Sequence, residues 1–130
     1  MLNKAIESVK MINNQSGLMR NLMMDLLDLA QMEKNTFKLT QSYFSMFEVI
    51  EQAFKIVEHY ADVKRVTLKP PQVSTAESNI YKHVYGDKNR FLQVIINFLS
   101  NSLKFSKVGS EVQLHLELQE IHNLVSTDFD

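Results

Sequence analysis

The sequence predicts an α/β (α+β) protein that begins with a long bundle-forming helix and continues into an α/β sandwich. In the first third of the 130 residues, apolar side chains recur with heptad spacing, which is typical of a helix that packs in a bundle. Further along, segments with helical periodicity alternate with segments in which every second residue is apolar. This alternation favours helices that cover one face of a sheet.

The composition excludes several classes of protein. The chain carries 14 basic and 15 acidic side chains and a net charge of −1. No excess positive charge is therefore available to bind nucleic acid through its phosphates. The absence of cysteine excludes disulfides, thiol catalysis and thiolate metal sites. No apolar run reaches the ~18 residues that a membrane-spanning helix needs. We expect no nucleic-acid partner and no membrane segment in this chain.

The first predicted helix covers about residues 2–35 and would be roughly 50 Å long. One heptad register places a seam of apolar residues, interrupted only by Ser16, along it. The seam consists of Leu2, Ala5, Val9, Ile12, Ser16, Met19, Met23, Leu26 and Ala30. Further leucines at 18, 22, 27 and 29 widen the stripe, which favours a bundle of more than two helices. Because one helix cannot bury its own apolar side, we expect a partner from another chain or from sequence upstream.

A strand and a second helix follow. Alternating apolar residues over 37–43 predict the strand. The pattern Ser45-x-x-Glu48 is a capping box, and the apolar residues after it recur at helical spacing. The predicted helix runs over about 46–63.

Short elements lead from there to the third helix. Apolar residues at 66 and 68 predict a brief strand, which the pair Pro70-Pro71 stops. Residues 72–79 are polar and are expected to form a surface loop, and a short strand is expected over 83–85.

The third helix is predicted over about 88–105, with Asp87 as its cap. A turn at residues 108–110 follows it. Over 111–118, apolar and polar residues alternate strictly, which is the clearest strand pattern in the sequence.

The third helix carries the side chains most suited to binding. At the helical period, one narrow face holds a row of uncharged amides with a cation at each end. These residues are Arg90, Gln93, Asn97, Asn101 and Lys104. An ordinary solvated face is the alternative, but asparagine is a poor helix former and is unusual there. Two amide oxygens one turn apart could accept a hard cation such as Mg²⁺, and a lysine one turn further could contact a phosphate. The spacing therefore indicates a phosphate or metal–phosphate site. An ordinary solvated helix face is the alternative interpretation.

The stretch from Gly86 to Ser106, GDKNRFLQVIINFLSNSLKFS, closely resembles the N box of sensor histidine kinases. The residues LLDLAQME, from Leu26 to Glu33, resemble the end of the second helix of the dimerisation and histidine-phosphotransfer hairpin. Residues from 37 onward resemble the start of the catalytic ATP-binding domain. The resemblance covers roughly 17–118, nearly the whole chain.

The resemblance implies a division into two parts and a nucleotide site. Residues 1–35 would be a partial dimerisation helix, and 36–130 the N-terminal part of an incomplete histidine-kinase-type ATPase α/β sandwich. In this family, the residue at the position of Asn101 holds the Mg²⁺ that bridges the ATP phosphates. Asn97, on the same face of the helix, would assist in holding the metal ion. Lys104 would face the phosphates, and Phe105 would lie near the nucleotide.

The resemblance also implies a function in two-component signalling. The parent would form a homodimer, transfer a phosphoryl group from ATP to a histidine and relay it to the receiver domain of a response regulator. The wider ATPase superfamily has a glutamate in place of Asn97 as a general base, and an amide cannot take a proton in that way. The chain thus resembles the phosphoryl-transfer branch. We expect a cytoplasmic location, with any membrane anchor of the parent in upstream sequence.

Two parts of the family pattern are missing. None of the four histidines, His59, His83, His115 and His122, lies in the acceptor pattern His-acid-x-base-x-Pro. The only glycines are Gly17, Gly86 and Gly109, and the ending Asp128-Phe129-Asp130 is not a glycine-rich box. We therefore expect a fragment truncated before the glycine-rich boxes, with no catalytic residue of its own and little or no ATP binding alone. The alternative is a catalytically inactive module that dimerises with or inhibits intact kinases.

Overall fold

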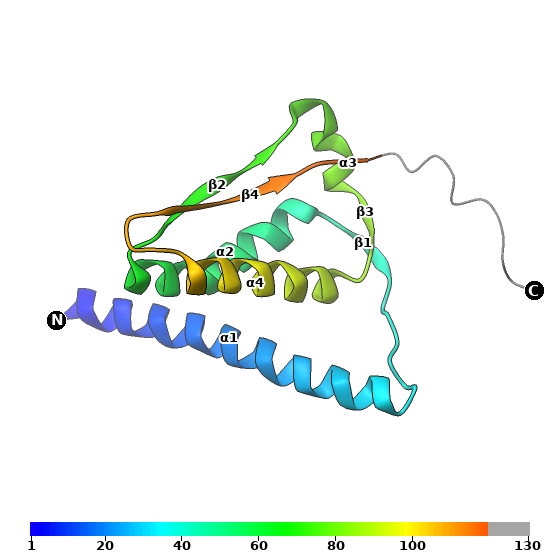
Figure 1. Ribbon diagram of the computed structural model, residues 1–130, viewed down its shortest axis with the longest axis horizontal. Coiled ribbons are helices and arrows are strands. Elements are labelled where there is room, and N and C mark those ends of the chain that lie inside the picture. Colours follow the sequence, from blue (N-terminus) through cyan, green and yellow to red (C-terminus); the bar gives the residue numbers. More distant parts are fainter. Residues whose placement is uncertain (120–130) are drawn as a thin grey trace, which may run out of the picture.

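The computed structural model describes residues 1–119 and consists of helical and strand layers stacked on one another (Figure 1). A pair of strands lies on one side of two helices, and the long N-terminal helix lies on their other side. The elements in chain order are α1 (Leu2–Glu33), β1 (Ser42–Phe44), α2 (Met46–Lys64), β2 (Thr67–Val73), a 3₁₀ turn η1 (Thr75–Glu77), α3 (Ser78–Lys82), β3 (Val84–Gly86), α4 (Lys88–Phe105) and β4 (Glu111–Leu116).

The core forms where α2 and α4 face each other and the strands. Every third or fourth residue of each helix is buried, as the apolar spacing predicted. The buried residues of these two helices are Met46, Val49, Ile50, Ala53, Val57, Ala61, Ile95, Ile96, Leu99 and Leu103. Both predicted helices are therefore confirmed within a residue of their expected ends.

The start of α2 corrects one detail of the prediction. Ser45 is the N-cap residue, as expected, and its backbone is extended, with φ −91° and ψ 123°. Its side chain makes no capping hydrogen bond, so the predicted capping box is not formed. The helix ends where Arg65 takes the left-handed conformation, with φ 54°.

The strand β2 is longer than predicted. The expectation that Pro70-Pro71 stops it is wrong, because β2 continues to Val73 beside the parallel strand β4. The register pairs Thr67 with Glu111 and Val73 with Leu116 and shifts between Lys69 and Gln72. Proline lacks a donor, and it is tolerated because β2 pairs on one side only within residues 1–119.

Two further predictions need correction. The predicted surface loop over 72–79 instead holds the end of β2, η1 and the start of α3. The predicted strand over 37–43 shrinks to β1, which pairs antiparallel with β3 so that Tyr43 lies opposite Tyr85. The strands form two separate two-stranded sheets in the described chain, and not the single layer expected.

The long helix α1 packs against α2 and α4 of its own chain, which the sequence did not predict. A Cβ atom added to Gly17 would lie 3.0 Å from Cγ1 of Ile56, so glycine permits this close approach to α2. The predicted seam remains exposed, with Met19, Met23 and Leu26 66%, 67% and 64% exposed. None of the helices within residues 1–119 is long and apolar enough to cross a membrane.

Candidate functional site

The helix α4 is held at its N-terminus by Asp87. One carboxylate oxygen of Asp87 accepts hydrogen bonds from the backbone N–H groups of Asn89 and Arg90, both at 3.1 Å. The other accepts from the backbone N–H of Thr40 at 2.8 Å, which ties the segment after α1 to α4. The predicted cap is confirmed. Asp87 thus sets where the polar face of α4 begins.

The environment of Asp87 also determines its charge. Burial alone raises the pKa of this carboxyl group, which is only 8% exposed. The backbone hydrogen bonds from Thr40, Arg90 and Asn89, together with the positive charge of Arg90, outweigh burial. The pKa of Asp87 is therefore lowered from its ordinary value, and the side chain is an anion at neutral pH.

The predicted polar face of α4 divides into two halves. In the N-terminal half, Arg90, Gln93 and Asn97 contact side chains of α1. In the C-terminal half, Asn101, Lys104 and Phe105 are exposed. The structure thus places Asn97, half-buried, at the boundary between a helix contact and an open surface.

Arg90 lies at the best-buried point of the contact with α1. Its guanidinium group forms an ion pair with Asp28, and the exposed fractions of the two side chains are 21% and 12%. It also donates to Gln93 Oε1 at 3.1 Å and lies 4.8 Å from the ring centroid of Phe37. One oxygen of Asp28, Oδ1, has no hydrogen-bond partner within the described chain. Arg90 pairs with the other oxygen, Oδ2, and its positive charge compensates the buried carboxylate.

Amide contacts extend this interaction along both helices. Gln93 donates to Asp25 and, at 3.0 Å, to Asp28. Asn21 donates through Nδ2 to Oδ1 of Asn97 at 2.8 Å. The sequence pattern of α4 alone did not predict these three α1 residues as its partners. A signal was present, because Asn21, Asp25 and Asp28 follow helical spacing on the side of α1 opposite the seam.

The open half of α4 combines amides, a cation and aromatic rings. The ammonium group of Lys104 lies 5.4 Å from the ring centroid of Phe105, which is 79% exposed. Phe98, on the turn between the two asparagines, is 66% exposed. Because Asn101, Lys104 and Phe105 are all exposed, residues 1–119 do not enclose a ligand around them. The arrangement can offer amide oxygens to a cation and a positive charge to an anion.

The histidines lie elsewhere. His59 is half-buried in α2, while His83 and His115 are exposed. His122 and the ending 128–130 fall outside the described residues. Within the described range, no three His, Asp or Glu side chains are grouped closely enough to hold a metal ion.

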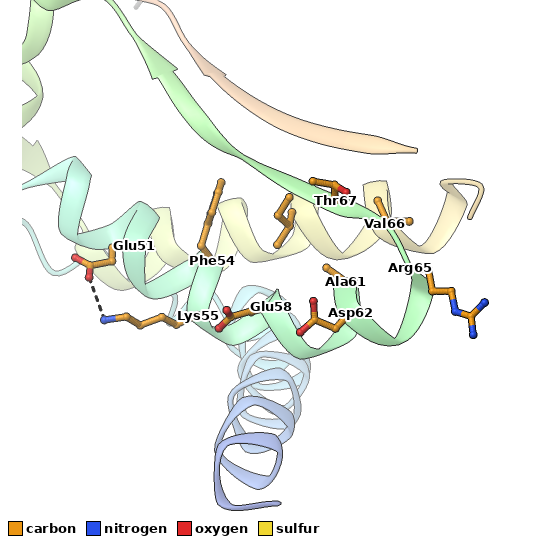
Figure 2. Close-up of a pocket in the computed structure, with 10 residues that line it drawn as sticks. Glu51, Phe54, Lys55, Glu58, Ala61, Asp62, Arg65, Val66 and Thr67 are labelled. Atoms are coloured by element: carbon orange, nitrogen blue, oxygen red, sulfur yellow. Dashed lines mark ion pairs between the residues drawn. The ribbon is translucent and has the colours of Figure 1, made fainter. Parts of the chain in front are cut away.

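A separate groove of about 630 Å³ lies between α2 and the start of β2 (Figure 2). Its walls include Glu58 and Asp62 of α2, and Glu51 forms an exposed ion pair with Lys55 at 3.0 Å. No residue of α4 lines this groove. It is therefore distinct from the predicted site.

Comparison with solved structures defines the class of fold. The chain is similar to the Acinetobacter baumannii histidine kinase AdeS, with a TM-score of 0.60 and 23% identity over 85% of this chain and 52% of that one. It is also similar to the cytoplasmic segment of the histidine kinase QseC, with a TM-score of 0.54 and 14% identity over 75% of this chain and 62% of that one. No protein-family model matches the sequence.

The fold is similar to that of part of these histidine kinases, a long N-terminal helix joined to an α+β domain. This confirms the fold class and the resemblance that the sequence predicted. The chain spans about half the length of the AdeS chain and less than two thirds of the QseC chain.

Proposed function

We propose that this chain is part of a cytoplasmic sensor histidine kinase of a two-component phosphorelay and that α4 binds Mg²⁺ and ATP. One observation carries the proposal. In a fold shared with histidine kinases, α4 presents Asn101 and Lys104 on an open surface next to Asn97. The nucleotide assignment itself rests on the sequence resemblance of residues 86–106.

The side chains present suit the proposed ligand. Asn101, with Asn97 one turn away, would supply carbonyl oxygens, which Mg²⁺ accepts alongside phosphates and water. Lys104 would contact the phosphates as a point charge, and the exposed ring of Phe105 would lie near the nucleotide. When bound, Mg²⁺-ATP supplies the phosphoryl group, while the metal neutralises phosphate charge. The amides bind and orient the ligand, and they cannot remove a proton from water.

The proposed partners follow from the rest of the chain. The exposed seam of α1 would pair with a second copy and give a homodimer. None of the three described histidines lies on α1, so the phosphoacceptor would come from another segment of the parent. The phosphoryl group would then pass to an aspartate in the receiver domain of a response regulator.

The substitution Asn101→Ala tests the nucleotide site. In the intact parent kinase, we expect the affinity for Mg²⁺-ATP, measured by calorimetry, to fall about tenfold or more because an interaction with charged groups is lost. Asn13→Ala is the matched control, since Asn13 is an exposed asparagine on α1. Equal affinities of the wild type and Asn101→Ala would refute the site.

A second candidate is a catalytically inactive module that pairs with intact kinases. The observation in its favour is the apolar seam of α1, which stays exposed although α1 already packs on its own chain. Co-expression with a tagged intact histidine kinase would test it. Recovery of mixed dimers with reduced autophosphorylation would favour this candidate, and exclusive recovery of homodimers would contradict it.

A further inference from the structure

The groove between α2 and β2 follows an edge of β2 that carries no neighbouring strand. Within residues 1–119, β2 pairs with β4 alone, on its other edge. The groove, of about 630 Å³, is lined by α2, by the start of β2 and by the turn between them. No residue of β4 or α4 lines it, and the lining side chains in Figure 2 all come from α2, β2 and this turn. The groove therefore lies on the free edge of β2.

The backbone of β2 directs unused hydrogen-bonding groups toward this edge. The N–H group of Thr67 donates to the carbonyl of Ser110 at 2.9 Å, so the backbone of Thr67 faces β4. Successive residues of an extended strand direct their N–H and C=O groups to opposite edges. The N–H and C=O groups of Leu68 are therefore directed away from β4. They are the groups with which an added strand would pair.

The prolines of β2 limit how long such an added strand can be. Pro70 and Pro71 have no N–H group, so a regular ladder on the free edge ends before them. Pairing is thus confined to the few residues around Leu68. The edge suits a short extended segment better than a long strand.

Apolar side chains of both elements line the groove. Phe54 points from α2 toward β2 in Figure 2, and Leu68 lies beside the same hollow. Ala61 and Val66 are buried members of the core that also line it. Because alternate residues of a strand point to one face, an added strand could place an apolar side chain against this surface.

The unbalanced charge along the groove is negative. Glu51 and Lys55 pair with each other at 3.0 Å, and Arg65 extends away from the other lining side chains in Figure 2. Glu58 and Asp62 are exposed, one turn apart on α2, and form no ion pair within residues 1–119. Like charges at this spacing repel, and carboxylates near the C-terminus of a helix are unfavourable. A positively charged partner would relieve both effects.

A second copy of β2 fits this edge less well than a basic segment does. If two β2 edges paired about a two-fold axis, Glu58 and Asp62 of both copies would lie at one interface and repel. The short stretch before Pro70 would offer few hydrogen bonds to offset that repulsion. Lys4 and Lys10 of α1 line an adjoining hollow, but in the described chain they form no ion pair with these carboxylates. The carboxylates therefore stay available to a partner.

We propose that the groove between α2 and the free edge of β2 binds an extended, positively charged peptide segment of a partner protein, which adds a short strand beside β2. The segment pairs with the backbone of Leu68 and places an apolar side chain against Phe54 and Val66. Its lysine or arginine side chains contact Glu58 and Asp62. The site shares no residue with α4 and does not depend on the proposed nucleotide site.

The first test measures binding of a fluorescein-labelled peptide, in which lysine and valine alternate, by fluorescence anisotropy. We expect saturable binding by the wild type and about fivefold weaker binding by Glu58→Lys, because an attractive charge becomes repulsive. Glu33→Lys is the matched control, since Glu33 is an exposed glutamate of α1 that does not line the groove, and it should bind like the wild type. No saturable binding by the wild type, or equal affinity of the wild type and Glu58→Lys, would overturn the proposal.

Two altered peptides separate strand addition from simple attraction between charges. N-methylation of two neighbouring central residues places one methyl group toward β2 in either register, and it should weaken binding about fivefold or more through loss of a hydrogen bond. Replacement of every lysine by glutamate should abolish saturable binding. Equal affinity for the methylated and unmethylated peptides would overturn the added strand. Equal affinity for the glutamate peptide would overturn the positively charged occupant.

The amide of Leu68 reports the added strand directly. In NMR spectra of the chain, the Leu68 signal should shift and its hydrogen exchange should slow on addition of the lysine–valine peptide, because the N–H group gains an acceptor. The signal of Met19, exposed on the seam of α1, should not change. Changes confined to the seam would overturn the proposed site. A Leu68 shift that follows the concentration of the chain without peptide would show that a second copy occupies the edge, and would overturn the peptide as its occupant.

Discussion

Asp87 shows how one residue links the sequence to the position of the candidate site. Its carboxylate caps α4 and also holds Thr40, so a single anion joins the segment after α1 to the helix that carries the site. Removing it leaves three backbone donors without their acceptor in a partly buried place. At the residue scale, the stability of this junction depends on the charge of Asp87.

We predict that Asp87→Ala lowers the free energy of unfolding at neutral pH by about 1–3 kcal/mol, through loss of the cap and its buried hydrogen bonds. The pKa of Asp87 is lower in the folded chain than its unfolded value of about 3.9. Its contribution is therefore complete above that value and is lost as the pH falls through the folded pKa. Urea unfolding of the wild type and of Asp87→Asn, at about pH 7 and about pH 3, measures how much stability the Asp87 anion contributes at each pH.

The stability difference between these two proteins should shrink at the lower pH. Asp62→Asn is the control, because Asp62 is exposed and has no hydrogen bond or ion pair to its carboxylate within residues 1–119. A difference for Asp87→Asn that is the same at both pH values would contradict the role of the anion.

At the scale of elements, α1 has two faces with different partners. Its polar side contacts α4 through Asn21, Asp25 and Asp28, and Leu18 packs near the core. Its apolar side is exposed along the length of the helix. A continuous exposed apolar stripe of this kind is typical of a protein–protein contact. The element is therefore suited to join its own domain and another helix at once.

We predict that Met23→Glu combined with Leu26→Glu abolishes self-association of the chain. Both side chains lie on the exposed seam, so charges there would repel in a symmetric pair without disturbing the core. Analytical ultracentrifugation over a range of concentrations measures the mass. Asn13→Glu, at an exposed position of α1 outside the heptad seam, is the control and should associate like the wild type. Equal masses for all three proteins would contradict pairing through the seam.

For the whole molecule, stability depends on the apolar layer between the helices and the β2–β4 pair. Leu103 and Val57 are 0% exposed, and partly buried side chains of β2 and β4 pack against the same cluster. The small β1–β3 sheet contributes Phe44, which is 7% exposed. Elements distant in sequence thus share one core, and the docked helix α1 adds to its edge.

We predict that Leu103→Ala lowers the free energy of unfolding by about 2–5 kcal/mol, because a fully buried leucine leaves a cavity. The matched control is Leu39→Ala, since Leu39 is 55% exposed, and its effect should stay within about 0.5 kcal/mol. Denaturant unfolding followed by circular dichroism compares the two. Similar losses for both variants would show that the core lies elsewhere.

The sequence by itself located the main helices and the clearest strand, and it predicted a candidate polar face. Helical periodicity located α1, α2 and α4, strict alternation located β4, and Asp87 was recognised as a cap. These features are local, because the spacing of apolar residues and the donors at a helix start lie within a few residues of one another. The polar face from Arg90 to Lys104 was predicted for the same reason. Its role toward nucleotide stays a prediction.

Only the tertiary structure decided how these parts meet. The prolines of β2 were predicted to stop a strand, yet an edge position makes their missing donors harmless. The expected single sheet is two pairs, since strand pairing depends on distant partners. The contact of Asn21, Asp25 and Asp28 with α4 joins residues more than sixty positions apart. Such contacts depend on the docking of whole elements, which no local pattern of residues specifies.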